Sequence, residues 1–158
     1  MPDNPSREKL VQRAKNVLLH QLSRSMKTKH QLLQVLLKRE IPEEVAIEVL
    51  DRFEEAQLID DAAFAKAFVS SRLSMGGKSR SAIARELRQK GVADTLIQES
   101  LSSLNSEMEL ELATNLARKR ADRLIGLDRD VRYRRLTGFL ARRGFSSAVI
   151  SSALRQIG

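Results

Sequence analysis

The residues best suited to chemistry in this sequence are an adjacent carboxylate pair, Asp60-Asp61. Two carboxylates can act as general acid and base or bind a metal ion, but both roles need further converging side chains. The sequence supplies no histidine, cysteine or third acid at a metal-ligand spacing from the pair. We therefore interpret the pair as a helix cap, because a carboxylate accepts hydrogen bonds from the free N–H groups of a first turn.

Two other patterns could in principle do chemistry. Ser70-Ser71 has no histidine–aspartate arrangement that would activate a serine. The segment Gly76–Ser79 is similar to the end of a phosphate-binding loop, but the upstream glycine is missing and a helix is predicted before it. We therefore predict no enzyme, no catalytic residue, no metal ligand and no cofactor. Lys78 and Arg80 could still make the following helix start favourable to anions.

The positive charge of the chain is concentrated in its last third. The net charge is +8, yet residues 1–112 contain 17 basic and 17 acidic residues, whereas residues 113–158 contain 11 basic and 3 acidic ones. A field of this kind attracts polyanions or an acidic protein surface. The alternative is a solvated helical face with spare arginines.

Basic side chains gather on three predicted helices, and we expect them to bind a partner or DNA. Arginine prevails in the last third, which favours bidentate contacts to phosphate or carboxylate. Tyr133 is nearly the only aromatic residue interleaved with them, so base stacking has little support. The candidate contact residues are Lys78, Arg80, Arg85, Arg88, Arg118, Lys119, Arg120, Arg123, Arg132, Arg134, Arg135, Arg142 and Arg143.

Composition predicts a folded, strongly helix-favouring protein, and we expect it to be monomeric and cytoplasmic. The chain has 158 residues, 42% hydrophobic and 30% charged, with three prolines, seven glycines and no cysteine. Its N-terminus is polar and lacks the apolar core of a secretory signal. No uncharged apolar run approaches the roughly 18 residues that a membrane span needs.

Apolar residues recur at helical spacing in nine segments. The first helix is expected to begin near Asn4-Pro5 or Ser6, and Gly91 to end a helix in the left-handed conformation. Ser106-x-x-Glu109 predicts a capping box, in which the two side chains satisfy backbone N–H groups reciprocally. The other expected helix starts are Thr28, Pro42, Asp60 or Asp61, Ser79, Asp128 or Asp130, and Ser146.

The nine segments fall into three similar groups. Leu36, Leu87 and Leu140 each lie four residues before Glu40, Gly91 and Gly144, and the offsets are 51 and 53 residues. Leu32, Ile83 and Leu136 coincide in the same overlay. We predict an all-α protein of three tandem three-helix repeats, at residues 1–58, 59–105 and 106–158, that form an elongated, curved body. Glu40 replaces glycine in the first repeat, so we expect that helix end to have a different shape.

The middle repeat resembles the signature of the RecX regulatory proteins. It has an acidic start, paired phenylalanines, a glycine break, a basic turn and a Glu-Leu-x-x-Lys-Gly end, in the order and spacing of that family. The matching residues are Leu58, Asp60, Asp61, Phe64, Ala65, Phe68, Arg72, Gly77, Glu86, Leu87, Lys90 and Gly91. The resemblance extends over essentially the whole chain, since the triplicated three-helix plan also fits.

This resemblance implies a regulator of the RecA recombinase in DNA repair, recombination and the SOS response. RecX-like proteins bind the groove of the RecA–DNA filament and typically suppress its ATPase, strand-exchange and coprotease activities. They block filament extension or promote disassembly, some bind DNA directly, and the family has no catalytic residues. We expect Arg132, Arg135, Arg142 and Arg143 to contribute to filament or DNA binding. The competing hypothesis is a stand-alone DNA-binding protein that uses the basic helices directly.

Overall fold

A computed structural model describes residues 6–158, which form α-helices joined by short turns and contain no strand. Ser6 caps the first helix, and the alternative start at Asn4-Pro5 lies outside the described residues. In chain order the elements are α1 (Arg7–Arg24), α2 (Lys29–Lys38), α3 (Glu43–Glu55), α4 (Asp61–Ser74), α5 (Arg80–Gln89), α6 (Asp94–Leu101), α7 (Ser106–Ala121), the 3₁₀ turn η1 (Asp122–Leu124), α8 (Arg129–Arg142) and α9 (Ser147–Ile157).

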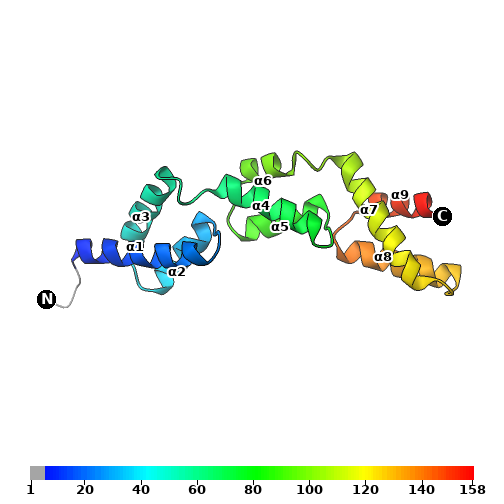
Figure 1. Cartoon of the computed structure of the whole chain (residues 1–158), viewed down its shortest axis with the longest axis horizontal. Helices are drawn as coiled ribbons and strands as arrows, with labels where there is room; N and C mark the ends of the chain where they lie inside the picture. The colour runs from blue at the N-terminus through cyan, green and yellow to red at the C-terminus, as the bar shows by residue number, and fades with distance from the viewer. Residues whose placement is uncertain (1–5) are drawn as a thin grey trace.

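The helices form three consecutive modules along one long axis (Figure 1). We call α1–α3 module 1, α4–α6 module 2, and α7–α9 with η1 module 3. Each module has its own cluster of buried aliphatic side chains. Leu32, Ile83 and Leu136, which the sequence overlay aligned, are all buried in these clusters. The all-α fold of three three-helix repeats in an elongated, curved body is therefore confirmed.

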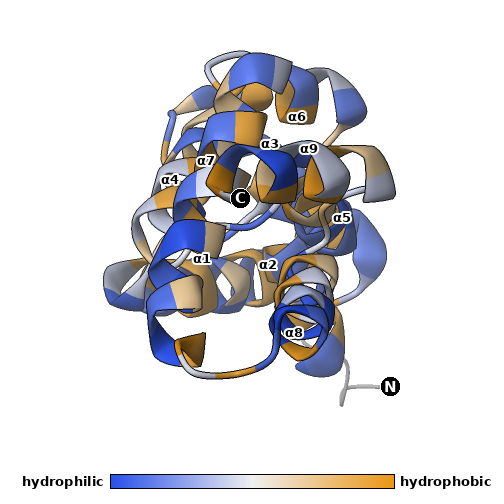
Figure 2. Ribbon diagram, turned by 90° about the vertical axis from the view of Figure 1, so that its right-hand side faces the viewer, coloured by the Kyte–Doolittle hydropathy of each residue, from blue (hydrophilic) through white to orange (hydrophobic). Residues whose placement is uncertain are grey.

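Short amphipathic helices build each small core. Hydrophilic and hydrophobic residues alternate along the helices (Figure 2), as expected when one stripe faces the module interior. The repeat boundaries after residues 58 and 105 remain predictions, and Ile59 packs in the core of module 1. A core of this size gains from packing on a neighbouring module. No helix of residues 6–158 is long and apolar enough to cross a membrane.

Most helix starts follow the sequence signals, but one does not. Thr28, Asp60 and Ser79 cap α2, α4 and α5 through side-chain hydrogen bonds from backbone N–H groups. The capping box at Ser106–Glu109 is wrong, because Asn105 caps α7 instead and accepts from the Met108 N–H. The Glu109 carboxylate is used elsewhere, as described below.

The end of α2 has the same backbone shape as the ends of α5 and α8. Glu40 has φ of 63°, close to the values of 85° for Gly91 and 92° for Gly144. The expectation of a different helix end in the first repeat is therefore wrong. A side chain in this left-handed region is strained by about 1–2 kcal/mol, so module 1 keeps the shared geometry at a cost in stability.

Candidate partner-binding surface

Three of the signature residues, Asp61, Lys90 and Gly91, lie at the contact between modules 1 and 2, which we call joint one. The Thr28 hydroxyl donates to the Lys90 carbonyl oxygen at 2.6 Å, and the Lys29 N–H donates to Asp61 Oδ1 at 3.0 Å. Gly91 approaches His30 so closely that an added Cβ would lie 2.2 Å from the His30 Cβ. Asp61 therefore caps a helix of the preceding module, while its neighbour Asp60 caps α4.

Modules 2 and 3 meet in the same way at a second contact, which we call joint two. The Ser79 N–H donates to the Arg143 carbonyl at 3.0 Å, and the Arg80 N–H donates to Glu109 Oε2 at 2.5 Å. An added Cβ at Gly144 would lie 2.6 Å from Ser79 Oγ. The anion that the sequence predicts at the start of α5 is thus a carboxylate of the chain itself.

Both joints place the middle helices of the modules head to tail. The carboxyl end of α5 meets the amino end of α2, and the carboxyl end of α8 meets the amino end of α5. The negative end of one helix dipole therefore faces the positive end of the next, an attractive arrangement. Burial raises the pKa of Asp61 above its usual value, against the lowering effect of the hydrogen bond from the Lys29 N–H.

A cluster of charged and aromatic side chains links α4 to α5 within module 2. Phe64 and Phe68 stack with ring centroids 6.0 Å apart, and the Arg72 guanidinium lies 4.4 Å from the Phe68 centroid. Glu86 accepts a hydrogen bond from Arg72 Nε at 2.8 Å and another from Lys78 Nζ. Burial works to raise the pKa of Glu86, but these two cations outweigh it and lower the pKa. The cluster therefore has a structural role.

The basic candidates of module 2 are mostly engaged within the protein. Lys78 pairs with Glu86, and Arg88 Nε pairs with Asp94 Oδ1 at 2.9 Å. The Nε atom of Arg80 is buried without a hydrogen-bond partner in the described residues. Arg85 is exposed and makes no such pair there. Module 2 thus presents much less free positive charge than its sequence suggests.

The basic side chains of module 3 form no ion pair within residues 6–158. All ion pairs found within residues 6–158 involve residues before position 95. The Arg143 guanidinium is not fully available to a partner, because it donates hydrogen bonds to the Gly76 and Gly77 carbonyls at 2.6 and 3.0 Å. Among the predicted contact residues, the exposed ones on module 3 are Arg118, Lys119, Arg123, Arg134, Arg135 and Arg142.

Four of the predicted arginines converge on one cleft of about 410 Å³ between α7 and α8. Arg120 comes from α7, whereas Arg134, Arg135 and Arg142 come from α8. The guanidinium of Arg120 also lies 5.2 Å from the Phe139 ring centroid, which orients it. Guanidinium groups that surround a cleft can bind phosphate or carboxylate oxygens. Which residues contact a partner stays a prediction.

A second cavity in module 3 is lined by two arginines that are not among the predicted contact residues. Arg129 and Arg155 line a cavity of about 690 Å³ together with the predicted Arg132. Arg129 belongs to the series of basic residues along α8 but was not chosen as a contact residue, and Arg155 was missed because no other basic residue lies near it in the sequence. Arg129 lies in the first turn of α8, where a positive charge is unfavourable next to the positive end of the helix dipole. This unfavourable position is the feature of the sequence that could have marked Arg129 as a binding residue.

The fold and the surface together define the class of this protein, which is all-α and has three tandem three-helix modules. The modules are joined head to tail through helix ends, and basic side chains that form no ion pair in the described part of the chain lie on the third module. Within residues 6–158 there is no group of three or more His, Cys, Asp or Glu side chains placed to hold a metal ion.

Family comparison identifies all three modules. The model for the RecX first three-helix domain matches residues 14–53, the second matches residues 60–101, and the third matches residues 107–154. The chain therefore belongs to the RecX family of regulatory proteins. The resemblance inferred from the middle repeat is confirmed over the whole chain.

Individual relatives agree with this assignment. The chain is 48% identical over 146 residues to the regulatory protein RecX of Streptomyces coelicolor, covering 92% of this chain and 78% of the relative. It is 42% identical to the regulatory protein RecX of Thermobifida fusca over 149 residues, or 94% and 80% of the two chains. The crystal structure of RecX from Lactobacillus salivarius matches with a TM-score of 0.83 at 21% identity, covering 94% and 97%, and shows the same fold.

Proposed function

We propose that this chain binds the RecA recombinase and its filaments on single-stranded DNA, and that it lowers recombinase, ATPase and coprotease activity. Membership of a family of regulatory proteins supports a regulatory role, and the sequence resemblance supplies RecA as the expected partner. DNA repair, recombination and the SOS response are the processes in which such a regulator acts.

The observation that carries this proposal is the free arginine surface at one end of an elongated body. A three-module body can lie along a helical filament and contact more than one subunit (Figure 1). The arginines around the cleft between α7 and α8 have no carboxylate partner within residues 6–158 and remain available to an acidic subunit surface or to phosphate. Electrostatic attraction of this kind gives rapid association that weakens with salt.

The test measures RecA ATPase rate and filament length on single-stranded DNA, with and without the protein. We expect the protein to lower both, and to lower them less at higher salt. The variant Arg134→Glu/Arg135→Glu/Arg142→Glu should bind filaments at least about ten-fold more weakly. A matched variant with three reversals of exposed basic residues in module 1, Lys9, Arg24 and Lys38, should bind nearly normally. No effect of the unaltered protein on ATPase or filament length would refute the proposal.

A second candidate function is direct DNA binding by module 3. It is favoured by the same cleft, because guanidinium groups there could neutralise adjacent phosphates. In that case binding to naked DNA would equal or exceed binding to RecA-coated DNA. The affinity for naked DNA would also fall steeply and linearly on a logarithmic salt scale.

A further inference from the structure

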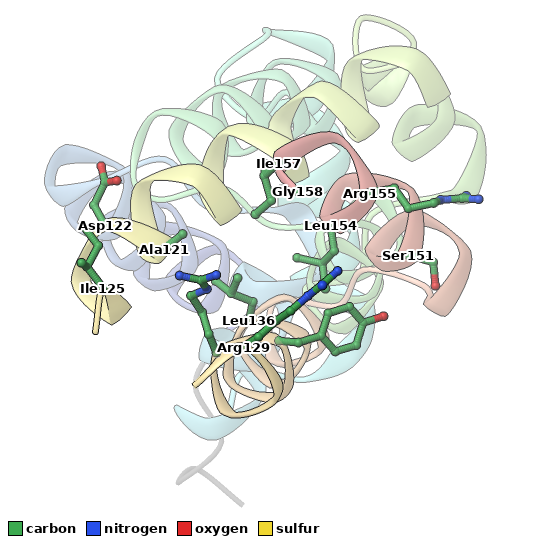
Figure 3. Close-up of a pocket in the computed structure, with 12 residues that line it drawn as sticks. Ala121, Asp122, Ile125, Arg129, Leu136, Ser151, Leu154, Arg155, Ile157 and Gly158 are labelled. Atoms are coloured by element: carbon green, nitrogen blue, oxygen red, sulfur yellow. The ribbon is translucent and has the colours of Figure 1, made fainter. Parts of the chain in front are cut away.

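The outer end of module 3 contains a cavity that is both basic and apolar. Its volume is about 690 Å³, and it lies between the end of α7, the start of α8 and the end of α9 (Figure 3). Arg129 reaches into it from α8, while Ile125 and Ile157 line opposite sides. The cavity therefore combines cationic groups with an apolar lining, a combination typical of ligand-binding clefts.

In the described part of the chain, no ion pair neutralises the arginines of this cavity. Arg129 and Arg132 form no ion pair within residues 6–158. Arg155 also lines the cavity, but its guanidinium points away from the centre in Figure 3. Asp122 also lines the cavity, but its carboxylate points away from the centre in Figure 3. Ile125 is 77% exposed beside these cations. An uncovered isoleucine next to unpaired guanidinium groups indicates a surface suited to an acidic, partly apolar ligand.

The corresponding corner of the other two modules is a protein-docking site. In modules 1 and 2, the corner between the first and second helices receives the start of the next module. Asp61 accepts from the Lys29 N–H there in module 1, and Glu109 accepts from the Arg80 N–H in module 2. Apolar side chains accompany the second carboxylate, since Leu112 packs against Gly77. Each docking segment is thus the acidic first turn of an amphipathic helix.

The corner of module 3 is built differently and stays uncovered by residues 6–158. The first helices of modules 2 and 3 align at an offset of 48 residues, since the buried residues Ala65 and Val69 correspond to Ala113 and Ala117. The second helices, α5 and α8, align at an offset of 53 residues. Five extra residues therefore lie between α7 and the aligned part of α8. They lengthen the start of α8 and supply Ile125. Where modules 1 and 2 have a close contact with the next module, module 3 has an open cavity.

A second copy of this chain fits the cavity poorly. Its first helix would have to dock as α4 and α7 do, but the position that aligns with Asp61 is Leu10 at an offset of 51. Arg7, Glu8 and Lys9 precede that position, so the helix start has a net positive charge and would be repelled by Arg129. Nucleic acid also fits poorly, because phosphates gain nothing from the apolar lining. An acidic, amphipathic segment of another protein would match both the cationic groups and the apolar lining of the cavity.

We propose that this cavity binds the acidic first turn of an amphipathic helix from a partner protein, with carboxylates on Arg129 and Arg132 and an apolar side chain against Ile125 and Ile157. The binding mode repeats the one by which each module holds the next. This inference does not depend on the proposed action on RecA, because the cavity shares no lining residue with the cleft between α7 and α8 and can be tested without the recombinase.

The test uses a peptide with the sequence of residues 105–117, which is the acidic helix start that docks at the corner of module 2. NMR titration of the labelled full-length protein should shift resonances of residues 121–133 and 151–157. The variant Arg129→Ala/Arg132→Ala should weaken the peptide affinity about ten-fold. Ile125→Asp should also weaken it, while the charge-matched control Lys9→Ala/Lys38→Ala should leave it unchanged.

Several outcomes would overturn this inference. They are the absence of any shift at peptide concentrations up to about 1 mM, shifts confined to joint two, and equal binding by the Arg129/Arg132 variant while it remains folded. A peptide with glutamine at positions 107, 109 and 111 should bind at least about ten-fold more weakly, and equal binding would remove the role of charge. Tighter binding of an oligonucleotide to the same residues would instead assign the cavity to phosphate.

Discussion

Substituting alanine for Gly91 tests the close contact that joins modules 1 and 2. Gly91 has φ of +85°, where a side chain costs about 1–2 kcal/mol. An added Cβ would also lie 2.2 Å from the His30 Cβ, well inside any normal contact. Because His30 belongs to α2 of module 1, the clash can be relieved only by a shift of one module against the other.

The expected loss is the sum of these two effects. Overpacking at a close contact costs about 1–3 kcal/mol, so Gly91→Ala should lower the free energy of unfolding by about 3 kcal/mol in total. Gly126→Ala is the matched control, since Gly126 has φ of +96° and nothing lies within 4 Å of its added Cβ. That variant should lose only the backbone contribution of about 1–2 kcal/mol.

Denaturant unfolding of both variants measures the difference, and hydrogen exchange locates it. Gly91→Ala should speed exchange at the start of α2 and the end of α5, whereas Gly126→Ala should not. Adding His30→Gly should restore part of the stability of Gly91→Ala, while His30→Ala should not, because it retains the clashing Cβ. If the two glycine variants were equally destabilised, the inferred docking of α2 on α5 would be wrong.

Three further predictions concern single side chains. Glu40→Gly should raise the free energy of unfolding by about 1 kcal/mol in denaturant titration, because it removes left-handed strain; no gain would mean that the strain is absent. Asp61→Ala should lower the free energy of unfolding by about 1 kcal/mol, because it removes the cap on the Lys29 N–H. Asp61→Asn keeps an acceptor and should lose less. The raised pKa of Asp61 means that its protonation favours the folded state as pH falls, and Asp61→Asn should lack this contribution in a denaturant titration at acidic pH. The lowered pKa of Glu86 means that its pairing with Arg72 contributes above its usual pKa of 4.5 and is lost as pH falls through its lower folded value. Glu86→Gln should therefore flatten the acid part of the stability–pH curve, and an unchanged slope would contradict the pairing.

Much of the fold could be predicted from the sequence, because local signals and the repeat agree. Cap residues such as Thr28 and Ser79 act where helical periodicity begins. The shared position of Gly91 and Gly144 gave the repeat length, and both residues are left-handed as expected. Glu40 misled the prediction, since the shape of that helix end is imposed by the surrounding module rather than by the residue type.

The candidate surface was less predictable, because charge patterns do not reveal partners. Glu109 matched a capping box in spacing but caps a helix in the preceding module. Arg143 belonged to a basic run, yet its guanidinium holds the Gly76 and Gly77 carbonyls across joint two. Such pairings depend on how modules dock, which single-sequence periodicity does not contain. The excess of basic over acidic residues after position 112 did indicate where ion pairs are absent, since no ion pair within residues 6–158 involves a residue after position 94.

The most direct test of the central claim is a comparison of two affinities. Binding of the protein to single-stranded DNA coated with RecA is measured beside binding to the same DNA without RecA, at matched salt. We predict clearly tighter binding to the coated DNA, with a loss of affinity when Arg134, Arg135 and Arg142 are reversed in charge. Equal or tighter binding to the naked DNA would contradict the account and identify the protein as a DNA-binding protein in its own right.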